Sequence, residues 1–253
     1  MIYAVVTGVS RGLGAAVAKR LLETGVHVIG VSRKGNSELS DIATSKGVKY
    51  KDERCDLSNL EEIEKAFNRI SEILMNNRPK KLYLINNAGV VEPIDHSMNI
   101  DHQALKDHVM INTLAPMVLM NMSLKYATEN GLTFVGATVT SGAAERPMYS
   151  WSAYCSTKAS INMYTETLAL EQKQLRTGHK VFAFSPGIMD TDMQSEIRKT
   201  SEEAFAERET FRAYKEKGML RAPEEVAGVL ADIITNESKI DSGKIYNVRD
   251  YLS

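Results

Sequence analysis

Short apolar runs rich in β-branched residues alternate along the chain with longer segments of helical period, and this alternation strongly constrains the fold. Seven runs predict strands, at Ile2–Thr7, Val26–Ser32, Val48–Cys55, Lys81–Ile85, Leu132–Thr140, Lys180–Phe184 and Lys244–Val248. Several are nearly continuous in Val, Ile, Leu, Tyr and Phe, which is typical of parallel strands buried on both faces. No repeat or linker interrupts the 253 residues. We therefore predict one α/β domain over residues 1–253, a doubly wound, seven-stranded parallel sheet with helices on both faces.

The charge balance gives no reason to expect nucleic acid or a membrane as a partner. Lys and Arg number 31 against 32 Asp and Glu, a formal net charge of -1. Cys55 and Cys155 lie in no Cys-x-x-Cys or Cys/His cluster, so neither a disulfide framework nor a metal site is indicated, and a reduced, cytoplasmic setting is expected. No apolar run approaches the ~18 residues of a membrane span. The expected partner is a small molecule.

A glycine-rich segment, TGVSRGLG, follows the first predicted strand and precedes a helical run. Gly8, Gly12 and Gly14 allow a tight strand-to-helix turn in which backbone N–H groups approach a pyrophosphate at the helix N-terminus. Their spacing differs from the usual G-x-G-x-x-G order, and a simple turn is the alternative. The strand before the loop and the helix after it favour a dinucleotide site.

The end of the second predicted strand, VSRKG, indicates which dinucleotide binds. An acidic residue there would bond the ribose 2′-hydroxyl of NAD. Ser32 and Arg33 stand in its place, and Arg11 lies in the glycine loop, so two guanidinium groups could flank a 2′-phosphate. The sequence therefore favours NADPH, although both arginines could instead be ordinary surface residues.

The stretch WSAYCSTKAS places Tyr154 and Lys158 four residues apart. On a helix this spacing puts both side chains on one face, where the ammonium can reach toward the phenol. Such pairs are also common on solvated helix faces, so the spacing alone does not assign a function.

Three further segments, CDLS, NNAG and TSG, follow predicted strands at the edge where open α/β sheets bind ligands. With the glycine loop and the Tyr/Lys pair, they make the chain resemble the short-chain dehydrogenase/reductase family over essentially its full length. The resemblance implies a Rossmann-type fold and a catalytic group of Asn112, Ser141, Tyr154 and Lys158. It also implies cofactor contacts from Gly8, Ser10, Arg11, Gly12, Leu13, Gly14, Ser32, Arg33, Asp56, Leu57, Asn87, Ala88, Gly89, Tyr154, Lys158, Pro186, Gly187, Ile188 and Thr191.

Each implied catalytic residue has a physical reason. Ser141 can donate a hydrogen bond that polarises a substrate carbonyl, and Tyr154 can supply the proton. A tyrosine pKa near ~10 would need to fall by roughly three units, or about 4 kcal/mol, for efficient acid catalysis. A cation about 4 Å away supplies that much at an effective dielectric constant of ~20, so Lys158 is expected to lower the pKa of Tyr154.

Asn112 lies four residues before Pro116 in a predicted long helix, 101–130. Proline has no N–H to give to the carbonyl four residues earlier, so the Asn112 carbonyl is expected to be left free. In the family the equivalent carbonyl holds a water that links to the lysine. A helix kink beside a buried asparagine is the alternative.

Substrate choice is expected to come from the residues around Tyr154 and from a charged, helix-prone segment, 190–218, that could form a lid. Met148, Tyr149 and Trp151, together with Met189, Met193 and Ser141, predict an apolar, partly aromatic substrate pocket, although these side chains could instead pack the lid or a subunit interface.

The segments TSGAAERPMYSWSAYCSTKASINMYTETLALE and FSPGIMDTDMQSEIR resemble the bacillary benzil reductases, the (S)-benzoin-forming members of the sepiapterin-reductase-like branch. That resemblance implies reduction of one carbonyl of an aromatic 1,2-diketone to an α-hydroxy ketone with NADPH, and a homodimer, with a tetramer as the other assembly. Sepiapterin reduction is the alternative activity. It would need a carboxylate to anchor the pterin, for which Glu145, Asp190 and Asp192 are candidates. A protein that senses NADPH without turnover is the alternative of another class.

Overall fold

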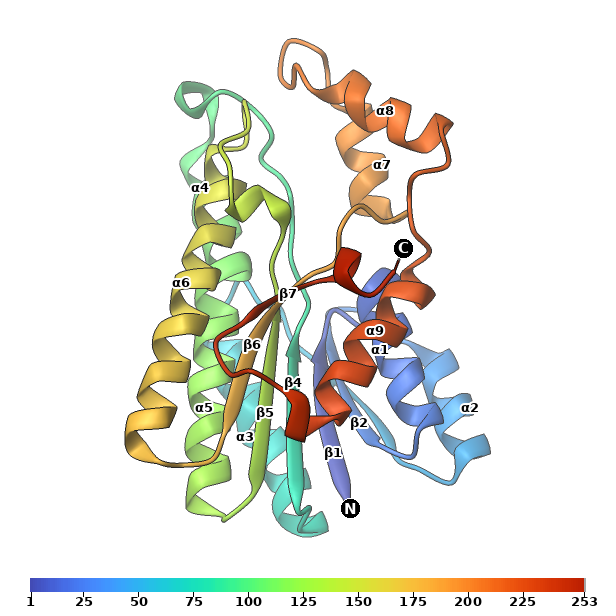
Figure 1. Ribbon diagram of the computed structural model, residues 1–253, viewed down its shortest axis with the longest axis vertical. Helices are drawn as coiled ribbons and strands as arrows, with labels where there is room; N and C mark the ends of the chain where they lie inside the picture. Colours follow the sequence, from blue (N-terminus) through green and yellow to red (C-terminus); the bar gives the residue numbers. More distant parts are fainter. Residues whose placement is uncertain (253) are drawn as a thin grey trace.

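A seven-stranded parallel sheet forms the centre of the computed structural model, which describes residues 1–252 (Figure 1). The strand order is β3-β2-β1-β4-β5-β6-β7. The strands are β1 (Ile2–Thr7), β2 (His27–Ser32), β3 (Tyr50–Arg54), β4 (Lys81–Asn86), β5 (Thr133–Val139), β6 (Lys180–Ser185) and β7 (Ile245–Asn247). All seven predicted strands are confirmed, with boundaries shifted by at most two residues. The doubly wound parallel fold is confirmed as well.

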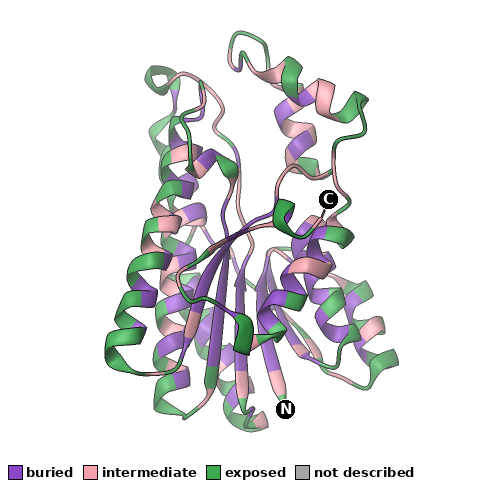
Figure 2. Cartoon of the chain, viewed as in Figure 1, coloured by how far each residue is buried: buried purple, intermediate pink, exposed green. Residues whose placement is uncertain are grey.

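Helices cover both faces of the sheet. Helices α1 (Gly12–Glu23), α2 (Ser37–Lys46) and α9 (Pro223–Thr235) pack on one face, and α3 (Leu60–Asn77), α5 (Ala115–Glu129) and α6 (Ser152–Leu175) pack on the other. Each face has its own apolar core, so the central strands are buried throughout (Figure 2). This explains why those strands lack the apolar–polar alternation of a half-exposed sheet.

The predicted helix over 101–130 is interrupted near its middle. Helix α4 (His102–Val109) continues into a π-helical segment (Met110–Leu114), which leads into α5. In the π segment the N–H of Ala115 bonds to the carbonyl of Met110, five residues earlier. Pro116 has no N–H with which to continue the usual ladder, so a local change of hydrogen-bond register at this point has a clear cause.

The chain reverses its winding direction between β1 and β4, and the carboxyl ends of these neighbouring strands point to the same edge. Ligands of open α/β sheets bind at this position. Helices α7 (Asp192–Lys199) and α8 (Arg208–Glu216) stand above that edge, at the top of Figure 1. Among residues 1–252, no helix has both the length and the apolar character needed to cross a membrane.

Candidate active site

A cleft of about 1340 Å³ lies along the carboxyl ends of the strands. Nearly all of the residues predicted to bind cofactor line it: Gly8, Ser10, Arg11, Gly12, Leu13, Ser32, Arg33, Asp56, Leu57, Asn87, Ala88, Gly89, Tyr154, Lys158, Pro186, Gly187, Ile188 and Thr191. The residues predicted to contact substrate that line it are Ser141, Met148, Trp151, Met189 and Met193. The fold therefore brings together segments that are up to about 180 residues apart in the sequence.

Three predicted site residues do not line the cleft. Tyr149 is 57% exposed and packs edge-on against His96, outside the lining of the cleft. Asn112 is buried behind the wall of the cleft. Gly14 is also buried and lies against the glycine turn rather than in the cleft.

The glycine turn is shaped by steric limits at two positions. Gly8 has φ +77°, a conformation that side chains disfavour, and its N–H bonds to the carbonyl of Val31. A Cβ on Gly14 would lie 2.3 Å from the carbonyl oxygen of Gly8. The first turn of α1 has no acidic residue, and Arg11 at its N-cap gives it no side-chain hydrogen bond. The N-terminal N–H groups of α1 can therefore receive a phosphate, and the turn fits a dinucleotide.

The end of the cleft beside β2 and β3 carries basic side chains and the carboxylate of Asp56. Ser32, Arg33 and Lys34 follow β2, and the N–H of Gly35 donates to Ser32 Oγ at 2.9 Å. Hydrogen bonds from Ser58 lower the pKa of Asp56, so this carboxylate stays charged and can accept from an amino group.

Arg11 differs from the sequence-based expectation. Its guanidinium makes an ion pair with Asp192 at 2.8 Å and a longer one with Glu196 at 3.8 Å, both in α7. Arg11 lines the cleft, but its guanidinium pairs with Asp192 of the segment 190–218 and does not stand beside Arg33 to flank a 2′-phosphate.

The predicted catalytic group lies where β5 and α6 meet the cleft. Ser141 follows β5, while Tyr154 and Lys158 occupy the first turns of α6 and are 7% and 5% exposed. Lys158 Nζ lies 5.7 Å from the centre of the Tyr154 ring and donates to the carbonyl of Val139 at 2.9 Å. The three side chains that the sequence grouped are thus close together in the structure.

The electrostatics of the pair differ from the expectation that Lys158 lowers the pKa of Tyr154. Burial raises the pKa of Tyr154, and the adjacent Ser141 hydroxyl opposes this rise. Burial also lowers the pKa of Lys158 to about 8. Removal from water disfavours both the Tyr154 phenolate and the Lys158 ammonium, so the protein alone does not lower the pKa of Tyr154 toward neutral pH.

The sequence and the known structures of other proteins agree with this geometry. A family model described as short chain dehydrogenase matches residues 3–202. The chain belongs to the short-chain dehydrogenase family. A crystal structure of the KRED1-Pglu enzyme superposes with a TM-score of 0.83 at 27% sequence identity, covering 97% of this chain and 100% of that one.

Several relatives within the family are named reductases. The benzil reductase ((S)-benzoin forming) of Bacillus subtilis is 37% identical over 249 residues, 98% of each chain. That of Bacillus cereus is 36% identical over 237 residues, 94% of this chain and 95% of the relative. A sepiapterin reductase of Xenopus tropicalis is 33% identical over 204 residues, 76% of each chain. The protein is accordingly an oxidoreductase that acts on CH–OH and C=O groups, a carbonyl reductase of the short-chain dehydrogenase family.

An aromatic cluster covers Tyr154, the tyrosine predicted to be catalytic in this reductase. The Trp151 ring packs edge-on against Tyr154 at 5.1 Å and stacks on Phe205 at 5.0 Å, while Phe211 lies 5.5 Å from it. Phe205 is fully buried although it belongs to the charged segment 190–218. That segment, the lid, therefore contributes apolar side chains directly above the catalytic group.

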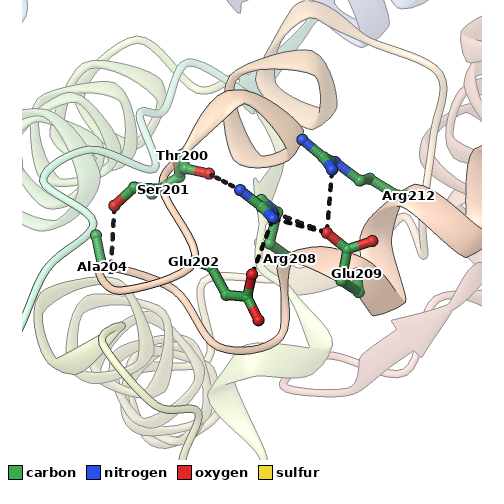
Figure 3. A network of polar contacts seen from close by, with 7 residues as sticks. All are labelled: Thr200, Ser201, Glu202, Ala204, Arg208, Glu209 and Arg212. Atoms are coloured by element: carbon green, nitrogen blue, oxygen red, sulfur yellow. Dashed lines mark hydrogen bonds and ion pairs between the residues drawn. The ribbon is translucent and has the colours of Figure 1, made fainter.

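Arg208 contacts the loop between α7 and α8 through Thr200 and Glu202 (Figure 3). Its guanidinium pairs with Glu202 at 3.3 Å and with Glu209 at 2.9 Å, and Nη1 donates to the carbonyl of Thr200. The Arg208 side chain is only 17% exposed, but Glu202 and Glu209 are 72% and 59% exposed, so solvent screens these ion pairs. The bond from Arg208 to the Thr200 carbonyl links the start of α8 to the end of α7.

Sequence reasoning missed four residues of the site. Lys34 lines the cleft directly after Arg33, and its position in SRKG could have predicted this. Phe205 and Phe211 lie in a stretch so rich in charged residues that its composition gave no indication of buried aromatic side chains. His108, four residues before Asn112, is buried and contacts it, but a single histidine on a helix gives no signal by itself.

Proposed function

We propose that this reductase uses NADPH to reduce one carbonyl of an aromatic 1,2-diketone such as benzil, giving an α-hydroxy ketone of the (S)-benzoin type. The observation that carries the proposal is the position of Ser141, Tyr154 and Lys158, which lie together beneath the Trp151 aromatic cluster at one end of the cleft. Two relatives that match nearly the whole chain are named benzil reductase ((S)-benzoin forming).

The choice of NADPH is supported by the residues after β2. Ser32, Arg33 and Lys34 line the adenosine end of the cleft, where an NAD-binding protein would place a carboxylate. A 2′-phosphate would meet one hydroxyl and two cations there, whereas a carboxylate would repel it. A bound nicotinamide would supply the hydride for reduction.

Ser141, Tyr154 and Lys158 together bind the substrate carbonyl oxygen and supply the proton that it receives. Ser141 donates a hydrogen bond to the substrate carbonyl and orients it. Tyr154 gives its phenolic proton to the same oxygen as negative charge develops there. Burial keeps Tyr154 protonated until reaction, since it raises the pKa of the phenol. Lys158 Nζ lies 5.7 Å from the centre of the Tyr154 ring, so its ammonium can offset part of the burial that opposes the phenolate.

The apolar side chains around Trp151 favour aromatic substrates. Trp151 and Phe211 line the cleft, and Met148 and Met193 pack against the same cluster. Flat aryl groups can stack on such rings, and thioether side chains adapt to their shape. Sepiapterin is the second candidate, because the relative from Xenopus tropicalis is named sepiapterin reductase.

The first experiment follows the loss of NADPH absorbance with benzil or sepiapterin as substrate. Saturable turnover of benzil, with sepiapterin much slower, is expected. Tyr154→Phe should lower kcat by about a thousandfold or more while leaving the dissociation constant of NADPH within about threefold, because only proton transfer is removed. Undiminished turnover by Tyr154→Phe would refute the mechanism, and NADPH binding with no turnover of any carbonyl would favour a sensor.

The cofactor assignment has its own test. Arg33→Asp should reverse the preference for NADPH over NADH, because it places a carboxylate where the 2′-phosphate would lie. Arg212→Asp, in the lid, is a control of the same charge change. An unchanged ratio of kcat/KM for the two cofactors in Arg33→Asp would eliminate the assignment.

A cytoplasmic homodimer is the assembly we propose. Helices α4 to α6 and the π segment expose several apolar side chains, among them Val109, Leu114 and Met163. Burial of such residues between two copies is a common route to a two-fold dimer. Light scattering coupled to gel filtration checks this, and a monomer or a tetramer would be the contrary result.

A further inference from the structure

His108 is a buried histidine outside the cleft, 1% exposed, on the last turn of α4. Its ring contacts three segments of the molecule. Nδ1 lies 2.6 Å from the carbonyl oxygen of Glu92, in the segment after β4. Nε2 lies 3.0 Å from Nδ2 of Asn112 and 3.1 Å from Oγ1 of Thr157, in α6. The ring thus joins the wall of the cleft to both helices that carry catalytic residues.

The contacts determine which ring nitrogen of His108 carries the proton. A carbonyl oxygen can only accept, so the short contact to Glu92 requires a proton on Nδ1. In the neutral ring Nε2 is then an acceptor, and an N–H of Asn112 Nδ2 points to it. The Thr157 hydroxyl has the carbonyls of Ala153 and Tyr154 as its own acceptors.

The amide of Asn112 is held on its other side by Val90. Nδ2 donates to the Val90 carbonyl at 2.7 Å, and Oδ1 accepts from the Val90 N–H at 2.9 Å. With His108 as the third partner, both amide protons are used and the amide cannot turn over without losing bonds. Val90 follows Gly89, and a Cβ added to Gly89 would lie 3.1 Å from Asn112 Oδ1 and 3.6 Å from Lys158 Nζ, so both side chains lie close to this backbone. The Asn112 amide thus fixes the backbone beside the catalytic lysine.

We propose that His108 is a positioning residue, which in its neutral form accepts from Asn112 and thereby fixes the Val90 segment and the π-helical turn beside Lys158. This inference rests on the proposed function for its catalytic consequence, but not for its structural one. A second proton on His108 would set an N–H of Nε2 against the N–H of Asn112 and break the contact.

The surroundings of His108 keep it neutral. Lys158 and the edge-on ring of Tyr154 face it from α6, and the segment after β4 offers the Glu92 carbonyl while the Glu92 side chain is exposed. Burial is the main cause that lowers the pKa of His108, and the charge of Lys158 adds to it, while the backbone carbonyls of Glu92 and Ala153 oppose the shift. The neutral acceptor therefore persists below the pH at which an exposed histidine becomes protonated.

Two substitutions separate the acceptor at Nε2 from the donor at Nδ1. His108→Gln can place an oxygen near the position of Nε2 and keeps an acceptor for Asn112. His108→Asn can place its N–H near the position of Nδ1, so it keeps the donor to Glu92 but has no acceptor for Asn112. We expect kcat for the diketone to fall about tenfold in His108→Asn and less than about threefold in His108→Gln, with KM for NADPH nearly unchanged in both.

Hydrogen exchange gives a readout that does not depend on turnover. In the protein without cofactor, the Val90 N–H should exchange about tenfold faster in His108→Asn than in the wild type, and close to the wild-type rate in His108→Gln. Equal losses in the two variants, or a milder effect of His108→Asn, would overturn the inference. If benzil is not turned over at all, the proposed function fails while the Val90 exchange rates still test the role of His108.

Discussion

Replacement of Lys158 by methionine is expected to stabilise the protein while it abolishes reduction. The Lys158 side chain is 5% exposed, and burial lowers the pKa of its ammonium from 10.5 to about 8. At about 1.4 kcal/mol per pKa unit, keeping the charge in the folded protein at neutral pH costs about 3 kcal/mol. Methionine removes this cost but also the bond from Nζ to Val139, worth about 1 kcal/mol. The net gain in the free energy of unfolding is about 2 kcal/mol.

The pH dependence of the gain identifies its cause. The unfolded chain keeps the Lys158 proton up to about pH 10.5, whereas the folded protein loses it near pH 8. Between these values the unfolded state binds more protons, so the stability of the wild type rises with pH. The advantage of Lys158→Met is therefore fully present below about pH 8 and shrinks toward pH 10.

Urea unfolding of the protein without cofactor, at several pH values from 7 to 10, measures both quantities. Lys173→Met, an exposed position on the same helix, is the matched control and should change stability by less than about 0.5 kcal/mol. A Lys158→Met variant that is less stable than the wild type at pH 7, or a difference that is constant across this pH range, would refute the reasoning.

Two further substitutions test the glycine turn and the lid. Gly14→Ala should destabilise the fold by about 2 kcal/mol or more, because its Cβ would meet the Gly8 carbonyl oxygen at 2.3 Å. The control Gly228→Ala, in open space on α9, should be neutral or stabilise the fold by up to ~1 kcal/mol. Thermal unfolding measures both changes, and equal effects would contradict the steric explanation. Phe205→Ala should increase the quenching of Trp151 fluorescence by acrylamide, because it uncovers the chain's single tryptophan. Phe205→Leu should give an intermediate increase. Unchanged quenching would show that the lid does not depend on this contact.

The sheet could be predicted closely because its strands are buried on both faces. In such strands the apolar run itself marks the element, and β1, β4 and β6 begin and end within one residue of the runs. The helix over 101–130 was less predictable. Pro116 indicated a disturbance, but the π-helical segment before it depends on how the chain packs between β4 and α6.

The substrate end of the site was the least predictable part. Trp151 and Tyr149 are both aromatic and stand two residues apart, yet one is 4% and the other 57% exposed. Residue type could not separate them, because the difference arises from the approach of Phe205, far along the chain. Arg11 shows the same limit, since its partners in α7 are more than 180 residues away.

The order of strands and helices along the chain, the glycine turn and the residues predicted to be catalytic could all be identified from the sequence, since each depends on local spacing or on uninterrupted apolar runs. Which charges and which rings meet depends on the tertiary structure. Burial, and not the proximity of Lys158, governs the pKa of Tyr154, and the acceptor for Asn112 is a histidine that no motif marks. These outcomes depend on desolvation and on contacts between distant segments, which local spacing does not encode.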